Sequence, residues 1–212
     1  ATTDIYTLSL HDALPICSEE IWKIVHRGSL PEIYINTNMS WDLFYASYVK
    51  TYIERDVRTI VNVKDLSLFT KLIMDLAART SQMLNFSVIS SEVWDDVKTI
   101  KSWIGNLEAS RIVVLIQPFS NNRLTHMLKT LMLYFLDTGL VCYLLSWLTP
   151  QALMKGAMSG QILDTFAVSE VVKSFKNQGM LKLPLYFYRD KDMNEIDIII
   201  EASGVLYPIS EV

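Results

Sequence analysis

The stretch SSEVWDDVKTIKSWIGNLEASRIVVLI, residues 90–116, decides the fold of this chain. It predicts two short helices, over residues 90–94 and 97–107, because the intervening pair Asp95-Asp96 suits a tight turn and a helix N-cap. The next run, residues 111–116, is apolar and β-branched, which favours a strand, and a proline and two asparagines then break it. Helix, turn, helix and hairpin follow one another in the order of a winged helix.

Two longer helices are expected before this stretch. In residues 41–61 the aromatic residues Phe44, Tyr48 and Tyr52 recur every four positions, which predicts one amphipathic helix. A second helix is predicted over residues 66–84, where leucines recur at the same spacing. Together with the helix-turn-helix and the hairpin, these helices make residues 41–130 a helical and winged-helix domain.

From Met132 onward the pattern changes to alternating strands and helices. Asp137-Thr138-Gly139 indicates a turn and an N-cap between a strand and the next helix, and Ser203-Gly204 indicates a hairpin turn. The chain is therefore predicted to be α+β, with residues 131–212 as its α/β part. The remaining expected elements are a strand at 132–136, a helix at 139–148, a polar turn at 149–160, a helix at 162–176 ended by Gly179, and strands at 183–189, 195–201 and 205–212.

Composition bounds the classes of protein that this sequence can represent. The 212 residues are 50% hydrophobic and 20% charged, with 7 glycines and 6 prolines, which excludes a disordered or collagen-like chain. The net charge of −4 provides no global attraction for nucleic acid or anionic lipid. Two cysteines without metal-ligand spacing favour the reducing cytoplasm. The apolar run 131–148 is interrupted by Asp137, so no membrane partner is expected.

Several ordered motifs carry a family resemblance: YVKTYIERDVR (48–58), LAART (76–80), LEAS (107–110), YFLDTGL (134–140) and FAVSE (166–170), followed by YRD (188–190), EID (195–197) and YPI (207–209). In this order they resemble the C-terminal domain of unknown function of prokaryotic AAA-type ATP-binding proteins. The resemblance implies a winged helix followed by a restriction-endonuclease-like (PD-D/E-x-K) α/β fold, truncated here at the C-terminus.

In that family a P-loop ATPase precedes the C-terminal domain. Trp22–Pro31 is similar to the last stretch of the ATPase, so residues 17–40 are expected to be its remnant or a linker. The sequence contains no G-x-x-x-x-G-K-S/T motif, and ATP is therefore expected only in the missing N-terminal domain. Residues 1–16 resemble a translated sequencing adapter and are left out of the fold prediction.

The nuclease-like fold implies acidic residues around Mg²⁺, which binds oxygen ligands and activates water. The candidate catalytic residues are Asp164, Glu170, Asp197 and Glu211, with Asp197 and Glu211 as metal ligands. Strand alternation places Glu195 on the same face as Asp197. The chain departs from the family where a P-I-E-x-K motif is usual, because Glu211 stands one position late, which turns its side chain to the opposite face, and the lysine is missing.

The winged helix instead suggests DNA binding through its second helix, where Lys98, Thr99, Lys101 and Ser102 are the candidate contacts. Trp103 on the same helix is expected in the core. Three functions remain open: an accessory region of an AAA-type protein that binds nucleic acid or a partner, a Mg²⁺-dependent DNA nuclease, and a protein-interaction module. The patch Arg55, Asp56 and Arg58 is interpreted as a solvated helix face, with docking of the protein's own ATPase domain as the alternative.

Overall fold

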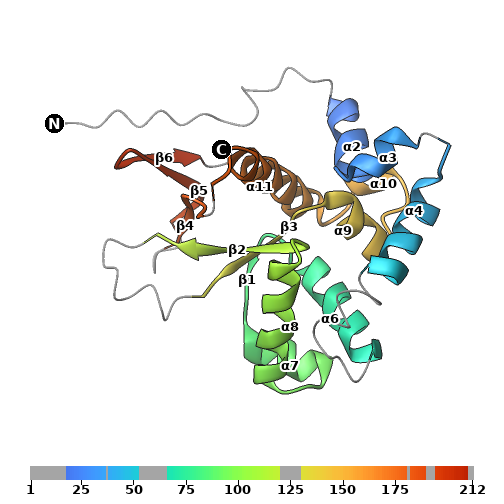
Figure 1. Ribbon diagram of the computed structural model, residues 1–212, viewed down its shortest axis with the longest axis horizontal. Helices are drawn as coiled ribbons and strands as arrows, with labels where there is room; N and C mark the ends of the chain where they lie inside the picture. Colours follow the sequence, from blue (N-terminus) through green and yellow to red (C-terminus); the bar gives the residue numbers. More distant parts are fainter. Residues whose placement is uncertain are drawn as a thin grey trace.

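The computed structural model describes residues 18–36, 38–52, 66–119, 130–180, 182–189 and 194–209. Within these ranges the chain is α+β, with one mixed six-stranded sheet and helices on both sides of it (Figure 1). The helices are α2 (Ser18–Arg27), α3 (Pro31–Ile35), α4 (Trp41–Tyr48), α6 (Leu66–Ala78), α7 (Phe86–Val93), α8 (Val97–Ala109), α9 (Thr138–Leu144), α10 (Pro150–Met154) and α11 (Ser159–Asn177). The strands are β1 (Gln82–Met83), β2 (Val113–Pro118), β3 (Met132–Phe135), β4 (Leu185–Arg189), β5 (Glu195–Ala202) and β6 (Val205–Ile209).

The sheet has the order β1-β3-β2-β4-β5-β6 and consists of two halves. In the first half β3 lies between β1 and β2 and is antiparallel to both. In the second half β4, β5 and β6 form an antiparallel meander. The halves meet where β2 runs parallel to β4; within the described residues two pairs join them, Gln117 with Tyr186 and Pro118 with Phe187. The sheet is therefore continuous but narrow at its centre.

Alternate residues of β2 and β3 belong to two different hydrophobic cores, because successive side chains of a strand point to opposite faces. Val113, Leu133 and Phe135 belong to the larger core, to which the helices from α2 to α10 and the first half of α11 contribute. Val114 and Tyr134, on the opposite face, belong to the smaller core between α11 and the second half of the sheet. The β2–β3 hairpin thus packs on both sides and joins the two halves of the molecule.

A buried carboxylate ties the N-terminal helices to the sheet. Asp137, 7% exposed, caps α9 by accepting the Leu140 N–H at 2.7 Å through Oδ1. The same oxygen accepts the Tyr45 hydroxyl at 2.8 Å, and Oδ2 accepts the Ser29 N–H at 2.6 Å. The loop after α2 can approach this closely because Gly28, at φ +83°, has no side chain. Helices α2 and α3, in the segment expected to be a remnant or linker, consequently pack into the core.

Several local predictions are confirmed, and others differ from the structure. Asp96 and Asp137 cap α8 and α9, and Ser203 and Gly204 form the β5–β6 turn with positive φ angles. Helix α7 begins four residues earlier than predicted, because Asn85 accepts the N–H groups of Ser87 and Val88 and starts it.

Three further predicted segments need correction. The helix predicted at residues 66–84 ends at Ala78, and β1 (Gln82–Met83) lies within the predicted range. The polar turn predicted at residues 149–160 contains α10, which Thr149 caps and which starts with Pro150, a residue suited to the first helical turn. The helix predicted at residues 41–61 is α-helical only to Tyr48 in the described part and continues as a π-helical turn over residues 49–52. No helix in the described ranges is long and apolar enough to cross a bilayer.

Candidate functional site

Helix α8 presents one buried and one exposed face, as its sequence predicts. Ile100, Trp103, Ile104 and Leu107 are buried, and the Trp103 ring packs edge-on against Phe69 at 5.5 Å between centres. Trp103 is therefore a core residue, which confirms the expectation. The helix begins at Asp96, whose Oδ1 accepts the N–H groups of Lys98 and Thr99 at 2.8 and 2.9 Å.

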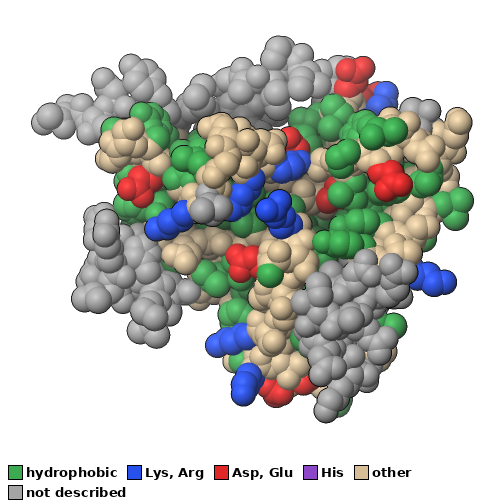
Figure 2. All heavy atoms as spheres, viewed as in Figure 1, with side chains coloured by type: hydrophobic (Ala, Val, Ile, Leu, Met, Phe, Trp, Pro, Cys, Tyr) green, Lys and Arg blue, Asp and Glu red, His purple; other side chains and the backbone are tan. Residues whose placement is uncertain are grey.

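The exposed face of α8 carries three of the four predicted nucleic-acid contacts. Lys98, Lys101 and Ser102 are exposed, and Lys101 Nζ lies 5.1 Å from the centre of the Phe86 ring, a cation–π distance. The fourth candidate, Thr99, donates its hydroxyl to Asp96 Oδ2 at 2.7 Å and so completes the cap. This bond, with those from the main chain, holds the pKa of Asp96 below its usual value. Figure 2 shows basic side chains along the lower edge of the molecule, over α7 and α8, together with acidic ones.

The charges of two of the predicted acidic residues, Asp164 and Asp197, both act on the hydroxyl of Tyr134. Burial raises the pKa of Tyr134 well above its usual value, a hydrogen bond with Ser81 opposes this, and the charges of Asp164 and Asp197 raise the pKa further. Asp164, on α11, also accepts the Ser81 hydroxyl at 3.0 Å. Tyr134 and Ser81 were not predicted as members of this site, because neither residue belongs to the acidic pattern from which it was inferred.

A β-bulge explains how Asp197 reaches this position. Between the pairs Tyr186–Ile199 and Tyr188–Ile196, two residues of β5, Asp197 and Ile198, stand opposite a single residue of β4. A bulge re-aims the side chains of the bulged strand. Ile198 belongs to the core beneath α11, and the charge of its neighbour Asp197 acts on Tyr134 in the same core. The bulge therefore places a carboxylate on the α11 side of the sheet.

Two further predicted acidic residues, Glu170 and Glu195, instead form ion pairs with basic neighbours. Glu170 stands six positions after Asp164 on α11, about 120° away around the helix, and forms a surface ion pair with Lys173. Glu195 pairs with Arg189 of the neighbouring strand at 2.6 Å. Glu211 lies outside the described residues, as does the patch Arg55, Asp56 and Arg58. Among the described residues no group of three or more His, Cys, Asp and Glu side chains is arranged to hold a metal ion.

Comparison with known families divides the chain between two family models. A domain of unknown function (DUF8612) matches residues 18–151, which is more than half of the chain, and a second one (DUF4143) matches residues 159–211. The first match ends within α10, and the second begins at the start of α11. No curated protein and no solved structure matches the chain significantly.

Proposed function

This chain belongs to the DUF8612 family of domains of unknown function, and we propose from this premise that it is the accessory region of an AAA-type ATP-binding protein and binds double-stranded DNA. Domains of the DUF4143 type, which the chain also carries, are commonly associated with AAA-type ATPases. The chain has no P-loop motif of its own, so ATP would be bound by another part of such a protein.

The proposal of DNA binding is supported by the exposed basic face of α8 and by the order of the helices and strands around this helix. Helix α6, strand β1, helices α7 and α8, and the β2–β3 hairpin follow one another in the order of a winged helix, with the strand order β1-β3-β2. The second helix of a helix-turn-helix pair enters the major groove. Lys98, Lys101 and Ser102 are the exposed side chains that α8 offers to phosphates and bases.

The double variant Lys98→Gln/Lys101→Gln tests this proposal. Each lysine that contacts a phosphate contributes about one unit to the slope of log K against log[salt], so the slope is expected to fall by about two and the affinity by about tenfold. Fluorescence anisotropy with a labelled duplex over a salt series measures both quantities. Lys23→Gln, an exposed lysine on α2, is the control and should leave them unchanged. An unchanged slope in the double variant would exclude α8 as the DNA-binding surface.

The arrangement of Asp164 and Asp197 favours a second candidate, a Mg²⁺-dependent nuclease. One carboxylate comes from α11 and the other from a bulged strand, and both charges act on Tyr134. Carboxylate oxygens are ligands that Mg²⁺ prefers, and Asp164 and Asp197 would supply some of the oxygen ligands that the ion needs. In such a site Asp164 and Asp197 would hold the ion, which would activate water for attack on a phosphodiester.

Isothermal titration of Mn²⁺ and Mg²⁺ into the whole chain separates this candidate from a purely binding function. If the second candidate holds, metal binding is expected in the parent chain and is lost in Asp197→Ala, because one of the two carboxylates is removed. Glu170→Gln removes an acid that pairs with Lys173 at the surface and should retain the metal. Equal binding by both variants, or no binding by the parent chain, would reject a metal site at Asp197.

A further inference from the structure

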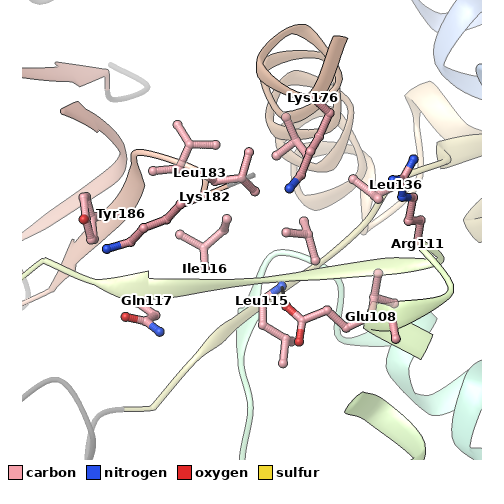
Figure 3. Close-up of a pocket in the computed structure, with 15 residues that line it drawn as sticks. Glu108, Arg111, Leu115, Ile116, Gln117, Leu136, Lys176, Lys182, Leu183 and Tyr186 are labelled. Atoms are coloured by element: carbon pink, nitrogen blue, oxygen red, sulfur yellow. Dashed lines mark hydrogen bonds between the residues drawn. The ribbon is translucent and has the colours of Figure 1, made fainter. Parts of the chain in front are cut away.

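A pocket of about 380 Å³ lies where the two halves of the sheet separate (Figure 3). Residues 113–116 of β2 pair with β3 on one side, and β4 joins the other side only from Gln117 onward. The chain that leads into β4, through Lys182 and Leu183, therefore stands apart from β2. Val172 and Lys176 of α11 complete the lining.

Three basic side chains from three separate segments line this pocket. Arg111 comes from the turn between α8 and β2, Lys176 from the last turn of α11, and Lys182 from the segment before β4. In Figure 3 Lys176 points from α11 toward β2, Lys182 extends along β2 toward Tyr186, and Arg111 lies at the other end beside Leu136. Figure 2 shows basic side chains gathered over the centre of this face. The cations thus surround the pocket rather than cluster at one point.

Glu108, the acidic side chain among the described lining residues, already accepts a hydrogen bond from the protein. Its Oε1 accepts the Leu115 N–H at 3.3 Å, and burial raises the pKa of its carboxyl group above the usual value. Among the lining residues that the structure describes, three basic side chains therefore stand with one carboxyl group. The remaining lining is largely apolar and includes Val114, Ile116, Leu136, Val172, Leu183 and Leu185.

We propose that this pocket binds a phosphate monoester with a flat apolar body, of about the size of a mononucleotide. A phosphate monoester carries a charge of about −1.5 to −2 at pH 7, which is complementary to the basic side chains that line the pocket from three segments. The Arg111 guanidinium can make paired hydrogen bonds to phosphate oxygens, and the two lysines add point charges. The apolar surface accommodates the body of the ligand, and the volume falls within the usual range of small-molecule pockets, about 300 to 1,000 Å³.

This site is separate from the DNA-binding face and does not depend on it. Lys98 and Arg111 lie at opposite ends of α8, about 15 to 20 Å apart along the helix axis at 1.5 Å per residue. The double variant Lys98→Gln/Lys101→Gln is therefore expected to bind the phosphate monoester as the parent chain does, whether or not the chain binds DNA.

Isothermal titration of AMP into the whole chain tests the proposal, with adenosine and inorganic phosphate as probes that lack the phosphate or the apolar body. AMP is expected to bind at least tenfold more tightly than either. Lys176→Gln should weaken AMP binding about tenfold or more, since one charge-assisted hydrogen bond is lost. Arg111→Asn should do the same, because asparagine tolerates the φ of +58° at this position.

Lys173→Gln is the matched control. This lysine is one turn before Lys176 on α11, pairs with Glu170 and does not line the pocket, so its variant should bind AMP unchanged. Equal binding of adenosine and AMP, or of inorganic phosphate and AMP, would overturn the proposal. The same holds for equal losses in Lys173→Gln and Lys176→Gln, and for no detectable AMP binding at millimolar concentration.

Discussion

Gly28→Ala is expected to lower the free energy of unfolding by about 4 kcal/mol. Two costs combine. A non-glycine residue at φ +83° pays about 1 to 2 kcal/mol for the left-handed conformation. The added Cβ would also overlap the Tyr45 hydroxyl and lie 2.8 Å from both carboxylate oxygens of Asp137, so the loop must move and break part of this network, at a further cost of about 2 to 3 kcal/mol.

Gly179→Ala separates these two costs. Gly179 has nearly the same backbone angle, φ +81°, but a Cβ there would meet no atom within 4 Å. Only the conformational cost remains, so the expected loss is about 1 kcal/mol. Urea unfolding followed by circular dichroism measures both variants. Equal losses in the free energy of unfolding would show that the close contact of Gly28 with Tyr45 and Asp137 does not contribute to stability.

Asp137→Ala is expected to cost about 4 kcal/mol of stability as well, although no backbone strain is introduced. The substitution removes the acceptor of the Ser29 N–H, the Tyr45 hydroxyl and the Leu140 N–H. A buried donor without a partner costs about 1 to 3 kcal/mol, and the Ser29 and Leu140 N–H groups both lose their acceptor, whereas the Tyr45 hydroxyl can still donate to the Arg27 carbonyl at 3.0 Å. Partial rearrangement keeps the total below the simple sum.

Asn85→Ala is the comparison for a helix cap at the surface. Asn85 caps α7 by accepting two N–H groups, at 3.1 and 3.2 Å, and water can replace it because these bonds are exposed. Its loss should cost about 1 kcal/mol, the usual value for an N-cap. Thermal and urea unfolding of both variants test the difference. A loss for Asp137→Ala no larger than that for Asn85→Ala would mean that the carboxylate acts only as a cap.

The sequence predicted the parts of the fold that depend on local chemistry. Asp96 and Asp137 were expected as caps because a short acceptor side chain before an apolar run satisfies free N–H groups, and the structure confirms both. The turn at Ser203-Gly204 follows from the same kind of local rule, with φ angles of +53° and +77°. The packing of α2 and α3 depends instead on Asp137, more than 100 residues further along the chain.

In the candidate sites, too, local features could be predicted from the sequence, whereas long-range contacts could not. Alternation placed Asp197 on one face of its strand, but the bulge in β5 and the influence of Asp164 and Asp197 on the same tyrosine, Tyr134, are visible only in the tertiary structure. The charged residues of the pocket are Glu108, Arg111, Lys176 and Lys182, and they are distributed over four segments of the chain. No periodicity joins them, because a side chain near the end of a helix and one before a strand meet only in the tertiary structure.

The two-pair junction between β2 and β4 has a consequence for the cooperativity of the molecule. In the described part of the chain few main-chain hydrogen bonds hold the halves of the sheet together there, so side-chain packing between α11, the β2–β3 hairpin and the second half of the sheet contributes much of the coupling. Regions joined by few backbone bonds open as separate units, with different rates of amide hydrogen exchange. The meander β4–β6 is thus the part of the sheet that can exchange its amides while the three strands of the other half remain protected (Figure 1).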